Sequence, residues 1–195
     1  MEVTIIFFQH IYESGTAPWI IDRPQKAFKQ MLREGFISGE VLDVGCGVGD
    51  NSIFLAEKGL KVVGIDYVGK AIQIAKSKAL KAHVSVEFLK GNALKLEELN
   101  KTFDTVIDSG LFHTFSDVER LKFKKSLEAI LKKGGNYIML CFSNLEKGSY
   151  GPRRIKKEEI RNLFRDNWSI QDIRPEIFES TWGKAKGWLS IIKKL

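Results

Sequence analysis

The residues best suited to chemistry lie in one glycine-rich segment, Val41-Leu42-Asp43-Val44-Gly45-Cys46-Gly47-Val48-Gly49-Asp50-Asn51. An apolar strand is expected before its glycines and a helix after them. Gly45 and Gly47 carry no Cβ atom, which lets the backbone approach a bound ligand. The segment therefore predicts a site for a nucleotide-like ligand. The alternative is a tight structural turn in which Asp43 accepts hydrogen bonds from the amides.

The acidic residues beside the glycines narrow the choice of ligand. The spacing is GxGxG, whereas dinucleotide-binding proteins have GxGxxG, and carboxylates stand at Asp43 and Asp50. Carboxylates repel a pyrophosphate and attract a ligand that carries a sulfonium and an ammonium group. The pattern favours S-adenosylmethionine (SAM) as the cofactor, with S-adenosylhomocysteine as its product.

A second carboxylate site follows the next apolar run. Asp66 ends that run about 20 residues after Gly45, where a carboxylate can accept hydrogen bonds from both ribose hydroxyls of a nucleoside. Tyr67 comes next and is placed to lie against the adenine. The alternative is that Asp66 only caps the helix expected to begin near Gly69.

Alternating apolar and amphipathic stretches are expected to position these residues. The strands are expected at Glu40–Val44, Lys61–Ile65, Val84–Leu89, Phe103–Asp108 and Asn136–Phe142, and the helices at Asn51–Lys58, Lys70–Leu80 and Asp117–Lys132, the last with Leu121 and Leu127 facing the sheet. This alternation is typical of a parallel sheet with crossover helices, so the fold class is α/β. A basic helix near Lys156–Arg165 and an antiparallel hairpin of Trp168–Phe178 with Lys186–Lys193 are expected to complete it.

Length and composition indicate one domain over residues 1–195. It divides into an N-terminal helical lid over 1–37, a cofactor-binding core over 38–143, and a substrate-side loop, helix and hairpin over 144–195. Two cysteines without CxxC spacing and three histidines give no support to a metal site or a disulfide scaffold. The start at Met1 and the absence of a long apolar run predict a cytoplasmic protein without a membrane partner.

The net charge of +7 comes from the second half of the chain. In residues 101–195, Lys and Arg outnumber Asp and Glu, whereas the two kinds balance in residues 1–100. This excess is either a solvated lysine-rich surface or a face that attracts nucleic acid or an anionic substrate.

Five segments, in this order, resemble the class I SAM-dependent methyltransferases: Val41–Gly49, Gly64–Asp66, Gly91–Ala93, Phe103–Asp108 and Leu131–Gly135. The resemblance covers about residues 38–143 with specific motifs. It implies a doubly wound, Rossmann-like sheet of seven strands, with helices on both faces, in which the last strand runs antiparallel to the other six.

The same resemblance implies a set of cofactor contacts. Gly45, Cys46 and Gly47 would meet the methionine end, Asp66 the ribose, Asn92 and Ala93 the adenine edge, and Asp108 the region beside the sulfonium; Asp43, Gly49, Asn51, Tyr67 and Ser109 complete the expected set. Many members of the family have Asp where this chain has Asn92. An Asn side chain can accept a hydrogen bond from the adenine amino group and can also donate one.

The segment Ala17–Gln25 is similar to the "proline-tryptophan … arginine-proline" segment of the thiopurine, thiol/halide and tellurite methyltransferases, with Ile20 and Asp22 in place of an expected Asp and Gly. The likeness implies a lid in which Trp19 shields the cofactor and Arg23 reaches its carboxylate or an anionic substrate. A plain packing segment is the alternative.

Two loops are expected at the carboxyl edge of the sheet, where ligands bind in open α/β folds. In Asp108–Phe115, His113 is a candidate general base for an oxygen or nitrogen nucleophile, or else a structural hydrogen-bonding residue. In Gly148–Arg154, a pair of arginines could clamp an anionic substrate, or the loop could be a solvent-facing turn. The candidate substrate residues are Phe112, Tyr150, Arg153 and Arg154.

Taken together, these features predict a monomeric or homodimeric enzyme that moves a methyl group from SAM to a small-molecule acceptor such as a thiol, a halide or a chalcogen oxyanion. Two alternatives stay open. One is an RNA or other nucleic-acid methyltransferase, which the basic second half favours and the absence of an Asn/Asp-Pro-Pro-aromatic motif after the fourth strand disfavours. The other is a non-catalytic SAM-binding protein that acts through a partner.

Overall fold

The structure is a computed structural model that describes residues 2–148 and 151–195. Its helices are α1 (Glu2–Ser14), α2 (Lys26–Arg33), α3 (Asp50–Glu57), α4 (Gly69–Lys81), α5 (Asp117–Ile130) and α6 (Lys157–Leu163), with 3₁₀ turns η1 (Ala93–Leu99) and η2 (Phe112–Thr114). Its strands are β1 (Glu40–Val44), β2 (Lys61–Asp66), β3 (Glu87–Lys90), β4 (Phe103–Ser109), β5 (Leu131–Phe142), β6 (Trp168–Ser180) and β7 (Gly183–Lys194).

The described strands form one sheet in the order β3-β2-β1-β4-β5-β7-β6. Strands β1 to β5 are parallel, and β7 lies antiparallel between β5 and β6. The expected doubly wound, seven-stranded α/β fold with an antiparallel end is confirmed. Because β1, β2 and β4 are parallel neighbours, their carboxyl ends meet at one edge of the sheet, on either side of the point where the strand order reverses.

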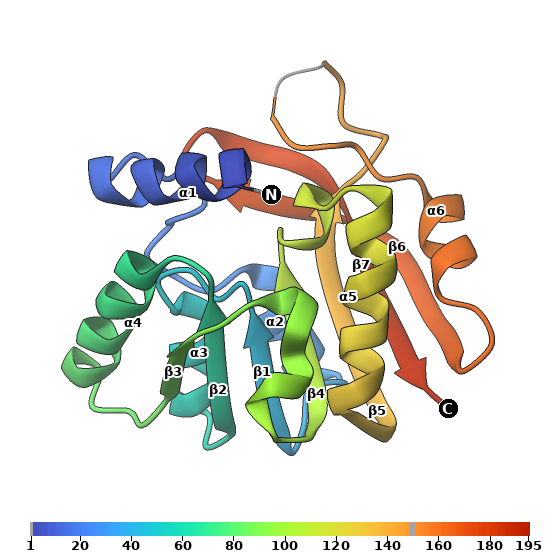
Figure 1. Ribbon diagram of the computed structural model, residues 1–195, viewed down its shortest axis with the longest axis horizontal. Coiled ribbons are helices and arrows are strands. Elements are labelled where there is room, and N and C mark those ends of the chain that lie inside the picture. The colour runs from blue at the N-terminus through green and yellow to red at the C-terminus, as the bar shows by residue number, and fades with distance from the viewer. Residues whose placement is uncertain (1, 149–150) are drawn as a thin grey trace.

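Helices cover both faces of the sheet, as Figure 1 shows, with α5 in front and α2 and α3 behind. The alternation of side chains along each strand supplies both layers of core. In β1, Leu42 and Val44 belong to the hydrophobic cluster that includes Phe123 and Leu127 of α5. Val41 belongs to the opposite cluster, with Phe28 and the other buried residues of α2.

The face of α5 that packs on the sheet differs in part from the sequence-based expectation. Leu121 is 61% exposed, so the expectation that it faces the sheet was wrong, whereas Leu127 is buried as expected. The helix begins with a capping box between Ser116 and Glu119, which sets its first turn. From that start, the residues that reach the sheet are Phe123, Leu127 and Ile130, at spacings of four and three.

The first 25 residues contain one helix and an extended segment. Helix α1 lies beside α4 at the end of the molecule that carries the carboxyl edge, and the chain then crosses that edge before α2 begins (Figure 1). We call residues 15–25 the strap. Within the described parts of the chain, no helix is long and apolar enough to cross a membrane.

A glycine at the start of α3 tests how tightly the sheet and helices are packed. Gly49 has φ +83°, and a Cβ added there would lie 2.6 Å from a ring carbon of Phe88. Gly49→Ala should therefore combine left-handed strain with overpacking and lower the free energy of unfolding by about 3 kcal/mol. Gly59→Ala is the matched control, because Gly59 has φ +84° but open space around it, and should cost about 1 kcal/mol. Equal urea midpoints for the two variants would contradict this packing.

Candidate cofactor and acceptor site

The turn between β1 and α3 brings the backbone of Gly45 and Gly47, which have no side chains, to the carboxyl edge. Gly47 has φ +55°, and a Cβ added there would lie 2.8 Å from the hydroxyl oxygen of Tyr12. Two hydrogen bonds anchor the loop to the end of β2: Cys46 N donates to Ile65 O at 2.8 Å, and Gly47 N donates to Asp66 Oδ2 at 2.9 Å. Gly49 stands apart from this surface, since it packs on Phe88 at the helix start.

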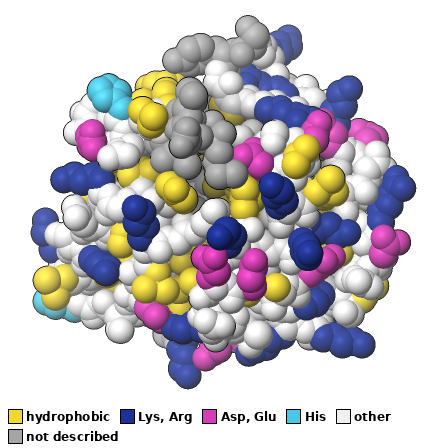
Figure 2. All heavy atoms as spheres, in the orientation of Figure 1, with side chains coloured by type: hydrophobic (Ala, Val, Ile, Leu, Met, Phe, Trp, Pro, Cys, Tyr) yellow, Lys and Arg dark blue, Asp and Glu magenta, His cyan; other side chains and the backbone are white. Residues whose placement is uncertain are grey.

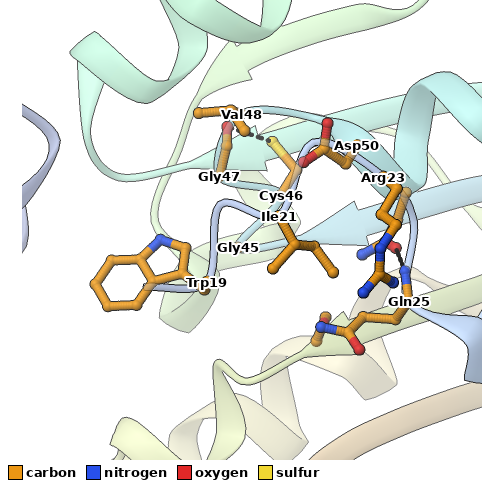
Figure 3. A pocket seen from close by; sticks show the side chains of 11 residues that line it. Trp19, Ile21, Arg23, Gln25, Gly45, Cys46, Gly47, Val48 and Asp50 are labelled. Atoms are coloured by element: carbon orange, nitrogen blue, oxygen red, sulfur yellow. Dashed lines mark hydrogen bonds between the residues drawn. The ribbon is translucent and has the colours of Figure 1, made fainter. Parts of the chain in front are cut away.

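A cavity of about 50 Å³ lies between this loop and the strap (Figure 3). Figure 3 shows the strap residues on one side and the glycine loop on the other. Of the residues that the sequence predicted for the cofactor, the cavity brings together Trp19, Arg23, Gly45, Cys46, Gly47, Asn51 and Ser109, and it adds Ile21, Gln25, Val48 and Asp50. The strap and the glycine loop, which the sequence analysis treats as separate motifs, therefore form one site.

Glu179 of β6 holds the strap in place, although no sequence motif points to this residue. Arg23 donates to both carboxylate oxygens of Glu179, at 2.7 and 3.2 Å. The Gln25 side chain pairs with the backbone of the same residue, at 2.8 and 3.1 Å, and Gln25 N donates to Asn51 Oδ1 at 3.0 Å. The pKa of Glu179 is lowered by Arg23. Arg23 therefore neutralises a carboxylate of the protein itself.

Asp43 places a buried carboxylate directly before the glycines. Its Oδ2 accepts from Ser52 Oγ at 2.6 Å, while its Oδ1 is buried and has no hydrogen-bond partner among the described residues. The pKa of Asp43 is raised to about 7, mainly by burial; the hydrogen bond from Ser52 opposes this rise, and the charges of Asp108 and Asp66 contribute to it. An incompletely satisfied carboxylate of this kind suits a positively charged ligand nearby.

Asp66 is held by two backbone amides. Its Oδ1 accepts from Val68 N at 2.8 Å, and its Oδ2 accepts from Gly47 N. The residue thus shapes the turn before α4, but it does not cap that helix, whose N-cap position is Val68 and has no side-chain cap hydrogen bond. Each carboxylate oxygen has more than one lone pair, so these bonds leave acceptor capacity for ribose hydroxyls.

The residues expected around the adenine lie outside the cavity. Tyr67 is 44% exposed, with the Lys90 ammonium 5.8 Å from its ring centroid. Asn92 Oδ1 accepts from Leu94 N at 2.9 Å and caps η1, and Ala93 follows as the first residue of that turn. The amide oxygen expected to accept from adenine therefore already accepts one backbone hydrogen bond, which leaves it one further lone pair.

Two expectations about the end of β4 were wrong. Asp108 is fully buried, and its carboxylate accepts from Leu111 N, Phe112 N and Tyr137 Oη at 2.8, 3.1 and 2.8 Å. It holds η2 against the sheet instead of facing the cavity. Phe112 is 1% exposed, and the Arg120 guanidinium lies 4.7 Å from its ring centroid. It is a core residue and cannot form a substrate wall.

His113 has the surroundings of a structural residue. It is 6% exposed, and its Nδ1 accepts from Phe142 N at 3.0 Å. Its ring packs on those of Phe142 and Phe178. Burial lowers the pKa of His113 to about 3, with the charges of Arg120 and Arg154 adding to the effect. This geometry favours the structural alternative over the general base.

The arginines of the loop after β5 tie that loop to other elements. Arg153 pairs with Asp117 at 2.6 Å and with Glu159 at 3.1 Å. The Arg154 guanidinium lies 5.4 Å from the ring centroid of Phe142. Neither lines the cavity between strap and glycine loop. Tyr150, the remaining expected substrate residue, lies outside the described residues.

Comparisons with known proteins identify the family of this chain. Residues 41–135 match the family model "Methyltransferase domain". The 2-heptyl-1-hydroxyquinolin-4(1H)-one methyltransferase of Mycobacteroides abscessus is 32% identical over 164 residues, which are 81% of this chain and 71% of that protein. A structure solved for the conversion of a disulfide bond into a thioacetal group during echinomycin biosynthesis has a TM-score of 0.88 and 27% identity, covering 97% of this chain and 92% of that one.

A further neighbour is magnesium protoporphyrin IX methyltransferase of Synechocystis PCC 6803, solved with bound SAM. Its TM-score is 0.68 at 21% identity, over 97% of this chain and 81% of that one, so it shares the fold. The strand order and the glycine loop at the carboxyl edge define the class I SAM-dependent methyltransferases. The chain belongs to this family, and it is a methyltransferase that uses SAM.

The residues at this edge suit that cofactor. A side chain at Gly45 would press on Leu111 and one at Gly47 on the Tyr12 hydroxyl, so the loop keeps bare backbone at the cavity. Asp43, whose Oδ1 has no partner among the described residues, precedes this loop in β1 but does not line the cavity. Both features match a ligand that lies against the backbone and carries positive charge.

The raised pKa of Asp43 should make cofactor binding depend on pH. A nearby sulfonium favours the ionised carboxylate, so binding releases a proton when Asp43 is protonated beforehand. SAM should bind about tenfold more tightly at about pH 8 than at about pH 6. S-adenosylhomocysteine has the same amino-acid end without the sulfonium, so calorimetry with it should give a smaller dependence, and Asp43→Asn should remove the difference. Identical pH profiles for the two ligands would contradict this assignment.

Proposed function

We propose that this methyltransferase acts on a small-molecule nucleophile that enters the space between the strap and the carboxyl edge. The observation that carries this proposal is the closure of the cavity. Its walls are the strap and the glycine loop, and Ser109 at the end of β4 lies among them. Hydrogen bonds to Glu179 fix the strap across this edge. An acceptor group attached to a large polymer would therefore have to pass beneath the strap to reach the cavity.

The described residues that line the cavity include no good base, so the acceptor's own ionisation matters. Among the described residues that line the cavity, the titratable ones are poor bases: Asp50 is paired with Lys78, Arg23 stays protonated, and burial raises the pKa of the Cys46 thiol. His113 is buried and accepts a backbone hydrogen bond. An acceptor that brings its own anion fits such a site, because a thiol with a pKa near 8.5 is already partly ionised at neutral pH.

The relatives support this class of acceptor. One acts, by its name, on an N-hydroxyquinolone, and another structure concerns sulfur in a disulfide. We therefore propose thiols, N-hydroxy heterocycles and related acidic hydroxyl compounds as the first acceptors to test, ahead of halides and chalcogen oxyanions.

In this proposal the protein's residues contribute binding and alignment. Asp66 holds the ribose, Gly45 and Gly47 lie against the methionine end, and Trp19 covers the site. When bound, SAM supplies a methyl group that its sulfonium already activates, so transfer needs an in-line nucleophile and little acid or base. Such alignment can lower a barrier by about 7 to 11 kcal/mol. The strap excludes water from the same space.

The surface gives less support to a nucleic-acid substrate. On the face shown in Figure 2, Asp and Glu side chains stand among the Lys and Arg side chains. Several arginines of the basic second half pair with acidic residues, among them Arg120 and Arg153 with Glu159 and Arg174 with Glu34. These pairs favour the solvated-surface interpretation. The cytoplasmic location and the monomeric or dimeric state stay predictions.

The acceptor class can be tested by S-adenosylhomocysteine release from SAM against a panel of thiols, N-hydroxy heterocycles, phenols, amines, halides, selenium and tellurium oxyanions, and RNA. We expect turnover with acidic sulfur or oxygen nucleophiles. At saturating SAM, the rate should rise with pH through the acceptor's own pKa, with no step that comes from His113. His113→Asn should leave that profile in place. Turnover with RNA alone would overturn the small-molecule proposal, and a pH step that disappears in His113→Asn would restore the general base.

A further inference from the structure

Tyr12 reaches the glycine loop from a helix that the sequence motifs leave out. It lies in α1 and is 6% exposed. Its ring belongs to a cluster that includes Val48, after the glycines, and Val68 and Ala71, at the start of α4. These residues come from the turns after β1 and β2, which flank the cofactor edge. Helix α1 therefore covers part of that edge.

The hydroxyl of Tyr12 is the part that meets the loop. Trp19 Nε1 donates to it at 2.8 Å, and the rings of Tyr12 and Trp19 lie edge to face with centroids 5.8 Å apart. The same oxygen is 2.8 Å from the position of a Cβ on Gly47, so it stands directly over backbone that has no side chain. In Figure 3 the Trp19 indole accordingly points away from Arg23 and Gln25.

This hydroxyl has a proton to donate. It accepts from Trp19, and no acceptor for its own O–H lies within hydrogen-bond distance among the described residues. Burial raises the pKa of Tyr12 well above its usual value, and the Asp66 charge raises it further. The phenol therefore stays neutral across the working pH range. A buried hydroxyl in an apolar cluster is costly unless its hydrogen bonds are made, so ring packing alone would favour phenylalanine at this position.

We propose that Tyr12 is a cofactor-binding residue whose O–H donates to a polar atom of bound SAM, and that Trp19 positions it. This inference rests on the proposed contacts of Gly47 and Asp66 with the cofactor. It extends the site from the glycine loop to α1, so that α1 and the strap close over SAM together through the bond between Tyr12 and Trp19. Cofactor affinity then depends on residues of the first helix.

The test is calorimetric binding of S-adenosylhomocysteine and SAM to full-length variants, which requires no acceptor. Tyr12→Phe keeps the ring and removes the donor, so we expect both ligands to bind about three- to tenfold more weakly. Phe7→Leu is the control on the same helix, because Phe7 is 55% exposed, and it should bind like the wild type.

A double-mutant cycle separates positioning from packing. Trp19→Phe should weaken binding, and the double variant Tyr12→Phe/Trp19→Phe should be less impaired than the sum of the single changes, because each variant breaks the same bond. The double variant also removes the partly buried indole N–H that Tyr12→Phe leaves unpaired, so it remains informative if the single variant is unstable. Hydrogen exchange of residues 2–14 should slow when S-adenosylhomocysteine is added to the wild type, and less in Tyr12→Phe.

The outcomes distinguish this inference from the proposed function. Wild-type affinity in a folded Tyr12→Phe variant would overturn the role of Tyr12, and an additive cycle would overturn its positioning by Trp19; both results leave the proposed function standing. A folded wild-type protein that binds neither ligand would instead overturn the cofactor contacts on which the inference rests.

Discussion

The site depends on the fastening of the strap to β6. Arg23 and Glu179 are 156 residues apart in sequence, yet their paired hydrogen bonds hold the N-terminal segment across the carboxyl edge of the sheet. Gln25 adds two bonds to the backbone of the same strand. Glu179 is 4% exposed, and a buried carboxylate is stable only with such partners. Without this contact, the glycine loop would face open solvent and the cavity would have one wall.

A second contact organises the opposite wall. The Asp108 carboxylate accepts three hydrogen bonds and bends the chain from β4 into η2. That bend presents Ser109 to the cavity and turns Phe112 and His113 into the core. This burial affects the chemistry, because the fold removes from solvent His113, the residue whose ordinary pKa best suits a general base. In the proposed function, the acceptor's own acidity therefore takes the place of a general base.

The sequence predicted the elements well because their signals are local. The expected strand at Glu40–Val44 has the bounds of β1, and the helix expected from Asp117 begins there because Ser116 caps it. The strand order needed the family resemblance, since pairing between distant strands leaves no local pattern. Strand β3 begins three residues later than expected, at Glu87, so local apolarity alone does not set where a strand pairs.

The site was predicted less completely, for reasons of side-chain direction. Asp108 and Ser109 are neighbours in one motif, but successive strand residues point to opposite sides, and only Ser109 reaches the cavity. Arg153 is attractive in sequence as an anion clamp, yet Asp117 and Glu159 stand close enough to bind it. Tyr12 and Glu179 carry no spacing signal, because tertiary packing alone brings each of them to the site.

The most direct test of the account is SAM binding by the wild type and by Asp66→Ala. Asp66 is the proposed ribose acceptor, and its carboxylate joins the glycine loop to the turn before α4. The account predicts that calorimetry detects binding to the wild type and none to Asp66→Ala, while circular dichroism shows that the variant is folded. Unchanged SAM affinity in folded Asp66→Ala would contradict the account.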